Sequence, residues 1–485
     1  DQHTKGTIWA GTDDGRLHIT QDDGETWTEI TPKDMPKYGT VNKIDVSNHA
    51  KGRAFVAVQK YRFDDFEPYI FMTNDYGKTW KRLTTGKNGI PNDYPVRVVR
   101  EDPDRKGLLY AGTEFGVFVS FDEGAHWQSL QLNMPIVPVT DMRVHRKDLV
   151  LSTQGRSFWI LDDISPLHEL DERLAQQEAH LFDPRPAYKV NDGGGGGLSE
   201  LAPEGKPGGA TMYYYLRDTA NQELMVEIVD QDARVVRVFT NDEKKAKAHK
   251  TKPLANKSGM HRMTWDLTYE GPTFVDDAII WGYTGGVKAP PGMYDVRLLV
   301  DGESVATQQV EVKEDPRIES DFTDEDYQEQ LALGLKLRDA ITEVHEKIAE
   351  IQSVKKQIKW LSEQAADDEE VQELASSLLA ELTAEEEKLM QTKNESGQDP
   401  IRFAPKLDNQ MVEAYNYVTG QDGYISGGRE GRPNEAAYTR TDDLEAEWAE
   451  VKKEVEATLE ESVNKFNEMV KIKNLIGVKR KESKS

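Results

Sequence analysis

Acidic side chains gather in short turns between apolar, alternating segments in the first third of the chain. They are Asp13, Asp64, Asp65 and Glu114. Glycoside hydrolysis uses two carboxylates, one as the acid and one as the base or nucleophile, so these four residues are candidates for that chemistry. Most acids in hairpin turns only form the turn or carry a solvated charge, and that is the alternative interpretation for each of them.

The same set of turns carries groups that could bind a ligand. Arg156 could hold a carboxylate through its planar guanidinium group. The aromatic residues could stack on sugar rings or on peptide side chains: Phe63, Phe66, Phe115, Tyr38 and Tyr94. The turns therefore predict either a catalytic surface or a binding surface.

Motifs of several other chemistries are not found in the sequence. The chain has no Cys, which excludes disulfides, thiolate metal sites and Cys nucleophiles. It has no phosphate loop, Ser nucleophile elbow or dinucleotide fingerprint. His18 and His145 show no metal-ligand spacing, and His345 is expected on the polar side of a helix without a partner ligand. We predict neither a metal nor a cofactor.

A repeated motif organises the region that holds these turns. It reads Ser/Thr-x-Asp-x-Gly-x-x-Trp, and its Asp residues lie 53 and 47 positions apart. Asp-x-Gly is typical of a hairpin turn, and the Trp is expected to be buried beneath it, at a cost of roughly 3–5 kcal/mol if replaced by Ala. We predict a structural role for all three copies: Thr20, Asp22, Gly24 and Trp27; Thr73, Asp75, Gly77 and Trp80; Ser120, Asp122, Gly124 and Trp127.

A motif that recurs at this period indicates repeated supersecondary units, here four blades of a β-propeller over residues 1–170. The first lacks its innermost strand, and the fourth ends in a decayed motif with Asp162 in register. Four blades are few for a propeller, so further blades are expected upstream or on a partner chain. Successive turns alternate between the two ends of a blade. The candidate residues should therefore share the face opposite the repeated motif.

This motif resembles the Asp-box, or BNR, repeat. The order of GRSFWILDDI, MHRMTWDL, APPGMYDVRL and a helical C-terminus further resembles bacterial secreted proteins labelled sortilin-like or glycosyl hydrolase. The resemblance covers nearly the whole chain and implies a propeller fold, an upstream propeller region and an export signal, hence a secreted, periplasmic or cell-surface protein. The sialidase Arg triad is not matched, because Arg62, Arg97 and Arg156 lack the supporting motifs.

Beyond the blades the sequence changes character twice. Residues 171–210 are predicted as a linker with a Gly-rich loop at Gly193–Gly197. Short alternating segments over 211–315, with a turn at Asp301-Gly302, predict an Ig-like or fibronectin-type β-sandwich. From 316 to 485 apolar residues recur every three or four positions. We predict an antiparallel helical bundle there, with a capping box at Thr323–Asp326 and a last helix from about Asp442.

Composition limits the partners. Lys and Arg number 61 against 87 Asp and Glu, a net charge of −26, which argues against nucleic acid. No apolar segment is long enough to suggest a transmembrane helix. Two functions remain: an exported binding or scaffold protein whose loops hold a glycan or peptide, with the other modules for protein docking, or a glycoside hydrolase that uses the loop carboxylates. Scattered, ion-paired acids would favour binding.

Overall fold

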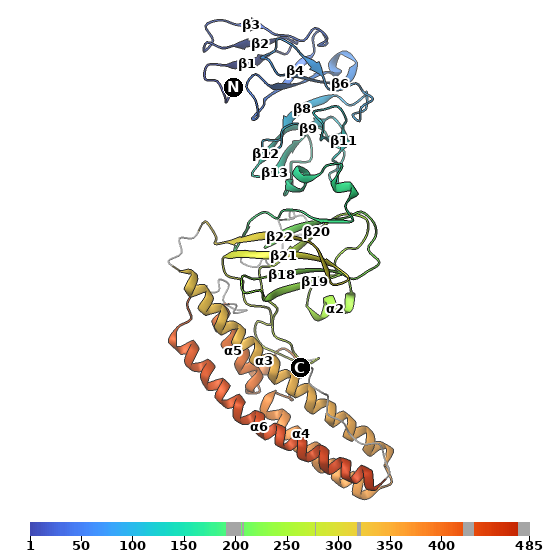
Figure 1. Cartoon of the computed structure of the whole chain (residues 1–485), viewed down its shortest axis with the longest axis vertical. Coiled ribbons are helices and arrows are strands. Elements are labelled where there is room, and N and C mark those ends of the chain that lie inside the picture. The colour runs from blue at the N-terminus through green and yellow to red at the C-terminus, as the bar shows by residue number, and fades with distance from the viewer. Residues whose placement is uncertain (191–204, 206–207, 277, 318–321, 421–430, 474–485) are drawn as a thin grey trace. The chain divides into compact units, whose positions relative to one another are not determined.

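The computed structural model describes residues 1–190, 205, 208–276, 278–317, 322–420 and 431–473. The chain divides into two compact units, Asp1–Ala175 and Gln176–Ser485. The first is built from strands, and the second combines strands with long C-terminal helices (Figure 1). This confirms the predicted change from β to helical structure. The predicted Gly193–Gly197 loop lies outside the described residues.

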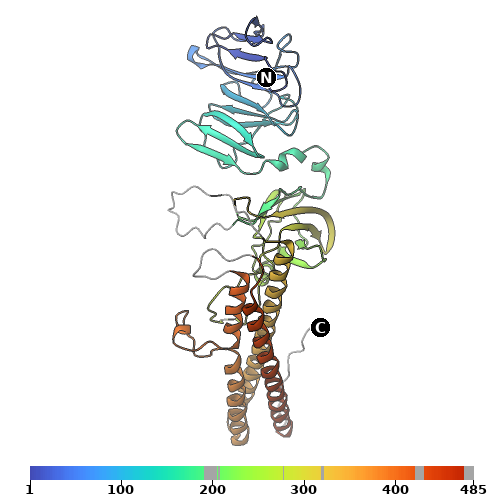
Figure 2. The same cartoon turned by 90° about the vertical axis from the view of Figure 1, so that its left-hand side faces the viewer.

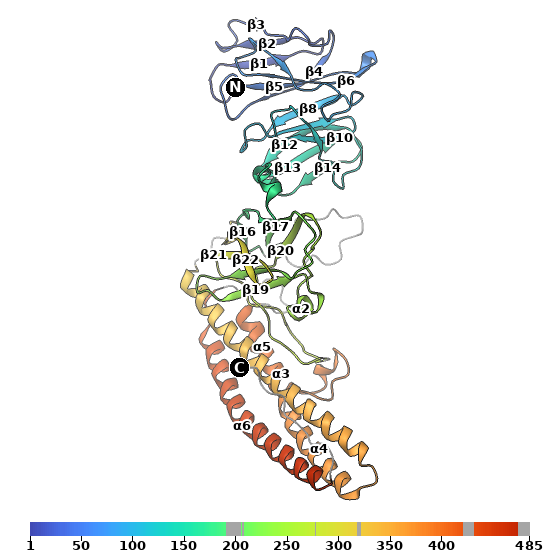
Figure 3. The ribbon, with the colours of Figure 1, turned by 45° about the vertical axis from the view of Figure 1, so that its right-hand side comes forward.

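The first unit contains four antiparallel sheets that follow one another along the chain, and we call them blades 1 to 4 (Figure 3). Blade 1 has β1 (Ile8–Gly11), β2 (Leu17–Thr20) and β3 (Thr28–Glu29), and blade 2 has β4 (Thr40–Val46), β5 (Ala54–Lys60), β6 (Asp65–Thr73) and β7 (Lys81–Arg82). Blade 3 has β8 (Val96–Glu101), β9 (Leu109–Thr113), β10 (Gly116–Ser120) and β11 (Gln128–Ser129). Blade 4 has β12 (Val139–His145), β13 (Asp148–Thr153) and β14 (Phe158–Leu161).

Neighbouring blades pack face to face through apolar side chains. Successive residues of a strand point to opposite faces, so each blade offers one face to the blade before it and one to the blade after it. Phe55 and Ile70 of blade 2, for example, share a buried cluster with Leu109 and Phe118 of blade 3. This serial packing of antiparallel sheets is that of propeller blades, and blade 4 replaces a fourth strand with the short helix α1 (Ser165–Glu169).

The repeated motif forms the turn before the last strand of blades 1 to 3. In the first copy, Thr20 donates to Asp22 Oδ1 at 2.7 Å, and the Asp22 carboxylate accepts the backbone N–H of Thr26 at 2.9 Å. Asp23 and Gly24 both have positive φ, 59° and 99°. The second and third copies repeat these bonds through Asp75 and Asp122. The motif is thus a self-contained turn whose polar groups are occupied.

The predicted burial of the three motif Trp residues holds for one copy and is wrong for another. Trp127 is 4% exposed and Trp80 is partly buried, but Trp27 is 46% exposed. The cause lies in the packing, because the two motif Trp residues that are wholly or partly buried contact the preceding blade: Trp80 Nε1 donates to Ile30 O, and Trp127 Nε1 donates to Leu83 O. No blade of the described residues precedes Trp27.

The second unit begins with a two-sheet sandwich (Figure 3). One sheet has the order β15-β17-β20 and the other β16-β22-β21-β18-β19. Their bounds are β15 (Ala179–Leu181), β16 (Ala187–Tyr188), β17 (Ala210–Leu216), β18 (Leu224–Val229), β19 (Val235–Thr240), β20 (Gly259–Trp265), β21 (Gly292–Val300) and β22 (Glu303–Lys313). Trp265 and Tyr294 meet across the core with ring centroids 5.1 Å apart. Part of the predicted linker is folded, since it supplies β15 and β16. The small helices η2 (Leu174–Gln176) and α2 (Glu243–Ala248) complete this region.

The described residues of the C-terminal part form four α-helices, with the long ones side by side, and the short 3₁₀ helix η3 (Asp399–Ile401) (Figures 1 and 2). The α-helices are α3 (Asp324–Gln364), α4 (Glu369–Leu389), α5 (Leu407–Thr419) and α6 (Glu435–Ile472). The capping box at Thr323 and Asp326 is present, while α6 begins at Glu435, seven residues earlier than predicted, directly after its N-cap Asn434. Among the described helices, none combines the length and apolar character needed to cross a bilayer.

The helices and the sandwich share one apolar core, joined by the segment between β20 and β21. Asn409 of α5 accepts from the backbone N–H of Trp281 at 2.9 Å and donates to its carbonyl at 3.0 Å. Tyr415 donates to Gly285 O at 2.8 Å. This segment also covers His345, which is 1% exposed, so the expectation of a polar-side His345 is wrong.

His345 lies 3.9 Å from the carboxylate of Asp408, which is 3% exposed. Burial raises the pKa of Asp408 to about 7 and lowers the pKa of His345 to about 4. The folded state keeps the Asp408 proton up to about pH 7, whereas the unfolded chain loses it near pH 4. The Asp408 contribution to the free energy of unfolding therefore falls as the pH rises through that range. His345 acts oppositely, and its contribution falls as the pH drops below 6.5.

We expect Asp408→Asn to stabilise the second unit by roughly 1–3 kcal/mol at pH 8, because it removes a buried charge that no cation among the described residues balances. At pH 4 the two proteins should have nearly equal stability, since Asp408 is then protonated. Urea unfolding followed by circular dichroism at 222 nm, from pH 4 to pH 8, measures the difference. Asp443→Asn, at an exposed position of α6 in the same unit, is the control. If Asp408→Asn is less stable than the original chain at pH 8, other groups of the protein stabilise the buried carboxylate and the expectation is wrong.

Candidate functional site

The turns between the second and third strands of the blades lie next to the segments that join one blade to the next. Backbone hydrogen bonds connect them: Val41 N to Thr12 O at 3.1 Å, Glu114 N to Pro95 O at 3.0 Å and Gln154 N to Pro138 O at 2.9 Å. In an antiparallel sheet these turns lie at the end opposite the repeated motif. We call this surface the loop face. It contains Arg156 and the candidate acids and aromatic rings, of which Asp65 and Phe66 are the first two residues of β6, directly after the turn.

Two of the four candidate acids on the loop face are engaged by neighbours. Glu114 forms an ion pair with Arg97 at 2.6 Å, and the guanidinium of Arg97 lies over the Tyr61 ring, 5.7 Å from its centroid. Asp65 accepts the Tyr69 hydroxyl at 3.0 Å and lies 3.4 Å from Lys60 Nζ. Burial and the Asp65 carboxylate raise the pKa of Tyr69 above its usual value. These two carboxylates are held in place by charge and hydrogen bonds.

The other two candidate acids face solvent. Asp13 and Asp64 are exposed, and Asp64 ends the 3₁₀ turn η1 (Tyr61–Phe63) with a positive φ of 58°. The Asp64 backbone N–H donates to Tyr61 O at 3.2 Å, so the turn itself explains the position of this residue. A hydroxyl from Thr40 donates to the backbone carbonyl of Asp13. The loop face thus offers two solvated carboxylates and two paired ones.

The aromatic rings of the loop face are the more unusual feature. Phe63 is 61% exposed, Phe66 is 47% exposed and Phe115 is 44% exposed. Phe63 stacks against Tyr38, which is 53% exposed, with centroids 6.3 Å apart. Phe115 lies 4.8 Å from the Tyr94 ring. Each pair joins one strand-to-strand turn to one segment between blades, so the rings hold the loops together while leaving apolar surface to solvent.

Arg156 lies in the turn before β14 and is exposed. Its guanidinium donates to the neighbouring Gly155 carbonyl at 3.2 Å, and its own carbonyl accepts from Trp159 Nε1 at 3.0 Å. The Trp159 bond fixes the backbone of the turn. The guanidinium remains at the surface, where an anionic group can reach it.

The repeated motif carries ionised acids with no role at the loop face. Hydrogen bonds, first of all from the Thr26 hydroxyl, lower the pKa of Asp22 to about 2. The pKa of Asp75 is also below its usual value, because bonds from Thr79 outweigh the effect of burial. His126 replaces the second hydroxyl in the third copy and lies 2.7 Å from Asp122 Oδ2. Carboxylates whose two oxygens both accept hydrogen bonds from their own turn are poor catalysts.

A charged network links the innermost strands and was not predicted from the sequence. Arg100 of β8 contacts Asp45 of β4 at 2.7 Å and Asp141 of β12 at 3.0 Å, and Lys43 reaches Asp141 at 2.7 Å. Burial raises the pKa of Asp45 even though Arg100 opposes the shift. The network joins three strands that are far apart in the sequence, β4, β8 and β12, so no local sequence signal could reveal it.

One group of potential metal ligands occurs among the described residues: Asp102, Asp104 and His168, with ligand atoms within 4.8 Å of one another. His168 lies 3.0 Å from Asp102 Oδ2, which also accepts the Tyr110 hydroxyl at 2.9 Å. Burial disfavours ionisation of Asp102, but bonds from His168 and the Asp104 backbone outweigh it and lower the pKa. The oxygens of Asp102 are occupied by protein donors, so the cluster is explained as the attachment of α1 to blade 3.

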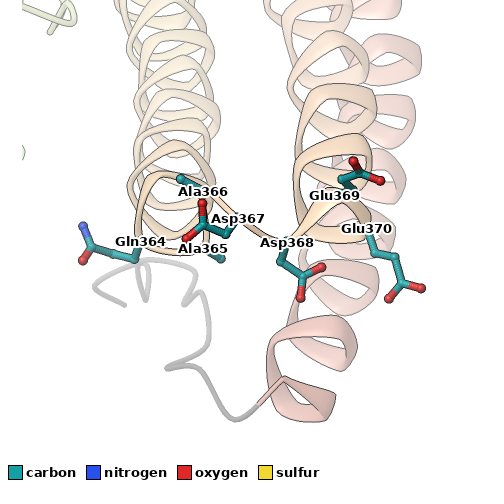
Figure 4. A pocket seen from close by; sticks show the side chains of 7 residues that line it. All are labelled: Gln364, Ala365, Ala366, Asp367, Asp368, Glu369 and Glu370. Atoms are coloured by element: carbon teal, nitrogen blue, oxygen red, sulfur yellow. The ribbon is translucent and has the colours of Figure 1, made fainter.

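A surface hollow in the second unit lies at the turn between α3 and α4 (Figure 4). Its acidic side chains point in different directions rather than toward one point. Asp368 caps α4 by accepting from Val371 N, and Lys473 contacts both Asp368 and Glu370 at 2.8 Å. These acids cap a helix and form ion pairs, so the loop face remains the candidate site.

No family model and no curated protein matches the chain. Solved structures similar to it include YCF48 from Cyanidioschyzon merolae, at 19% identity and a TM-score of 0.26, over 33% of this chain and 51% of that one. A GH74 enzyme from Niastella koreensis is 12% identical with a TM-score of 0.28, over 63% and 52%. The Dos1 propeller is 10% identical with a TM-score of 0.24, over 63% and 56%. The chain thus spans about half the length of these proteins.

Proposed function

We propose that residues 1–175 are blades of an exported Asp-box propeller and that their loop face binds a glycan or a peptide. One observation carries this proposal: the rings of Phe63, Phe66 and Phe115 are exposed, while the acids Glu114 and Asp65 are already held by Arg97, Lys60 and Tyr69. Exposed rings on turns of a rigid scaffold are suited to stacking on sugars or apolar side chains. In this proposal, the Ig-like sandwich and the helical bundle are docking modules for other proteins.

Hydrolysis is the alternative function, and Asp13 and Asp64 are the observation that favours it. Both carboxylates are exposed and could reach a substrate. A glycosidase requires two carboxyl groups on either side of one bond, within about 5–10 Å of each other. Asp64→Asn tests this possibility with little strain, because Asn also accepts a positive φ. Loss of turnover on a glycan, with binding retained, would favour the hydrolase.

The binding proposal is tested with a combined Phe63→Ala and Phe66→Ala variant. A glycan array and a peptide array on the full chain first identify a ligand, and calorimetry then measures its dissociation constant. We expect the variant to weaken binding at least about tenfold, because truncated aromatic anchors usually cost more than 1 kcal/mol. The melting temperature should change little, since both side chains are exposed.

The matched control is Trp360→Ala, which removes a 55% exposed ring from α3 in the other unit. It should leave the dissociation constant unchanged. If the double Phe variant binds as tightly as the original chain, or if Trp360→Ala weakens binding equally, the loop face is not the ligand site.

A further inference from the structure

The two internal interfaces that contain a motif Trp are built in the same way. Trp80 Nε1 donates to Ile30 O at 2.7 Å, and Trp127 Nε1 donates to Leu83 O at 3.3 Å. The accepting residue directly follows the last strand of the preceding blade in both cases. Its aliphatic side chain also fills the space above the motif Gly. A Cβ placed on Gly77 would lie 2.6 Å from Ile30 Cδ1, and one on Gly124 would lie 2.9 Å from Leu83 Cδ1.

Blade 1 presents the same surface without a cover. The pairing of Ile8 with Thr20 and of Leu109 with Ser120 makes Ile8 the counterpart of Leu109. Leu109 is fully buried, but Ile8 is 46% exposed, as is Trp27. The atom nearest to a Cβ on Gly24 is Nε1 of its own Trp27, at 3.8 Å. Among the described residues, no side chain takes on blade 1 the position that Ile30 or Leu83 takes in the other interfaces.

We propose that the surface formed by Ile8, Gly24 and Trp27 is a docking site for another β-propeller blade. This blade has a fourth strand followed by a branched aliphatic residue. The aliphatic side chain fills the space above Gly24, and its backbone carbonyl accepts the Trp27 indole N–H. The internal interfaces supply the chemistry of the partner, because blades 2 and 3 receive the same two groups from the blades before them.

A second copy of this chain does not provide the required groups. In its last blade, blade 4, the helix α1 replaces the fourth strand. The carbonyls of Leu167 and Leu170, which follow β14, already accept from Arg105 of blade 3. The partner blade therefore has a different sequence and a complete fourth strand.

The chain contains a suitable test blade. Residues Lys106–Gly112 read KGLLYAG, in register with KGTIWAG at Lys5–Gly11. We therefore fuse a copy of residues 40–104 to the chain directly before Thr4. The β4–β7 part of this copy forms an added blade, and its β8 part becomes the missing innermost strand of blade 1, at the same spacing as in the native sequence. Hydroxyl-radical footprinting read by mass spectrometry reports the reactivity of Trp27 itself. We expect that reactivity to fall by about tenfold, toward that of Trp127, as the exposures of 46% and 4% indicate.

The control is the same fusion with Leu83→Asp in the added copy, which removes the aliphatic residue and should leave Trp27 reactive. Equal Trp27 reactivity in the fusion and in the original chain would overturn the proposal. A second measurement does not depend on the folding of the added blade. In sedimentation velocity the original chain should remain a monomer. If the original chain is a dimer and Trp27→Gln makes it monomeric, a second copy of the chain binds this surface, and the proposal is also overturned.

Discussion

Arg53→Met is expected to destabilise the first unit by roughly 3–5 kcal/mol, because it leaves a buried carboxylate without its cation. Arg53 is 2% exposed, and its guanidinium donates to Glu101 Oε1 at 2.8 Å across the interface between blades 2 and 3. The same group donates to Asn74 at 2.9 Å and to Glu123 at 3.0 Å. One side chain thus connects four segments.

Glu101 is 7% exposed and has no alternative cation among these contacts, since its other partners are Ser47 and the Gly107 N–H. Hydrogen exchange of β5 and β8 in the full chain measures the opening free energy of this unit alone. Arg16→Met is the control, because its ion pair with Asp14 is exposed and 3.7 Å long, worth less than about 1 kcal/mol. The double variant Arg53→Met with Glu101→Leu should recover part of the loss. If the double variant is as unstable as Arg53→Met alone, the destabilisation comes from the lost packing of the Arg53 side chain and not from the unpaired Glu101 carboxylate.

The local parts of this fold were predictable from the sequence, since its strongest signals are local. A Ser/Thr, Asp and Gly at fixed spacing close a turn through bonds within eight residues, and the alternation around the turn defines the strands. The capping box at Thr323 is local in the same way. Asn434 caps α6, but the first turns of that helix carry no apolar stripe, and the predicted start was therefore too late.

Burial set by distant segments was not predictable. His345 is followed in sequence by the charged residues Glu346 and Lys347, but it is covered by the segment around Val275, seventy positions away. Arg53 and Glu101 are separated by 48 positions. The loop face followed from strand alternation, which brings Asp64 and Glu114 to one end of the blades, but the pairing of Glu114 with Arg97 depends on side-chain positions. Whether Glu114 is ion-paired or free to act on a ligand depends on this contact, so the function was harder to predict from the sequence than the architecture.

The three motif Trp residues occupy the same position of the repeated motif but should contribute different amounts to the free energy of unfolding. Trp127→Ala is expected to cost roughly 3–5 kcal/mol, because it empties a buried site next to Phe55 and Leu83 and removes the bond to Leu83 O. Trp27→Ala should cost no more than about 1 kcal/mol, since nearly half of this side chain already contacts water. Hydrogen exchange of β9 and β2 compares the two variants within one chain.

Equal costs would show that the indole stabilises its own turn rather than the interface with the preceding blade. The repeated geometry indicates the reverse: the turn is held by Asp22 and Thr20, whereas the Trp side chain stabilises only the contact between blades. The same comparison in the chain with the added blade separates the two causes. Covering Trp27 should raise the cost of Trp27→Ala toward that of Trp127→Ala, because the ring would then be desolvated and its N–H would have a carbonyl to bind. If Trp27→Ala still costs about 1 kcal/mol or less in the chain with the added blade, the added blade does not pack on blade 1 in the way that blade 1 packs on blade 2 and blade 2 packs on blade 3.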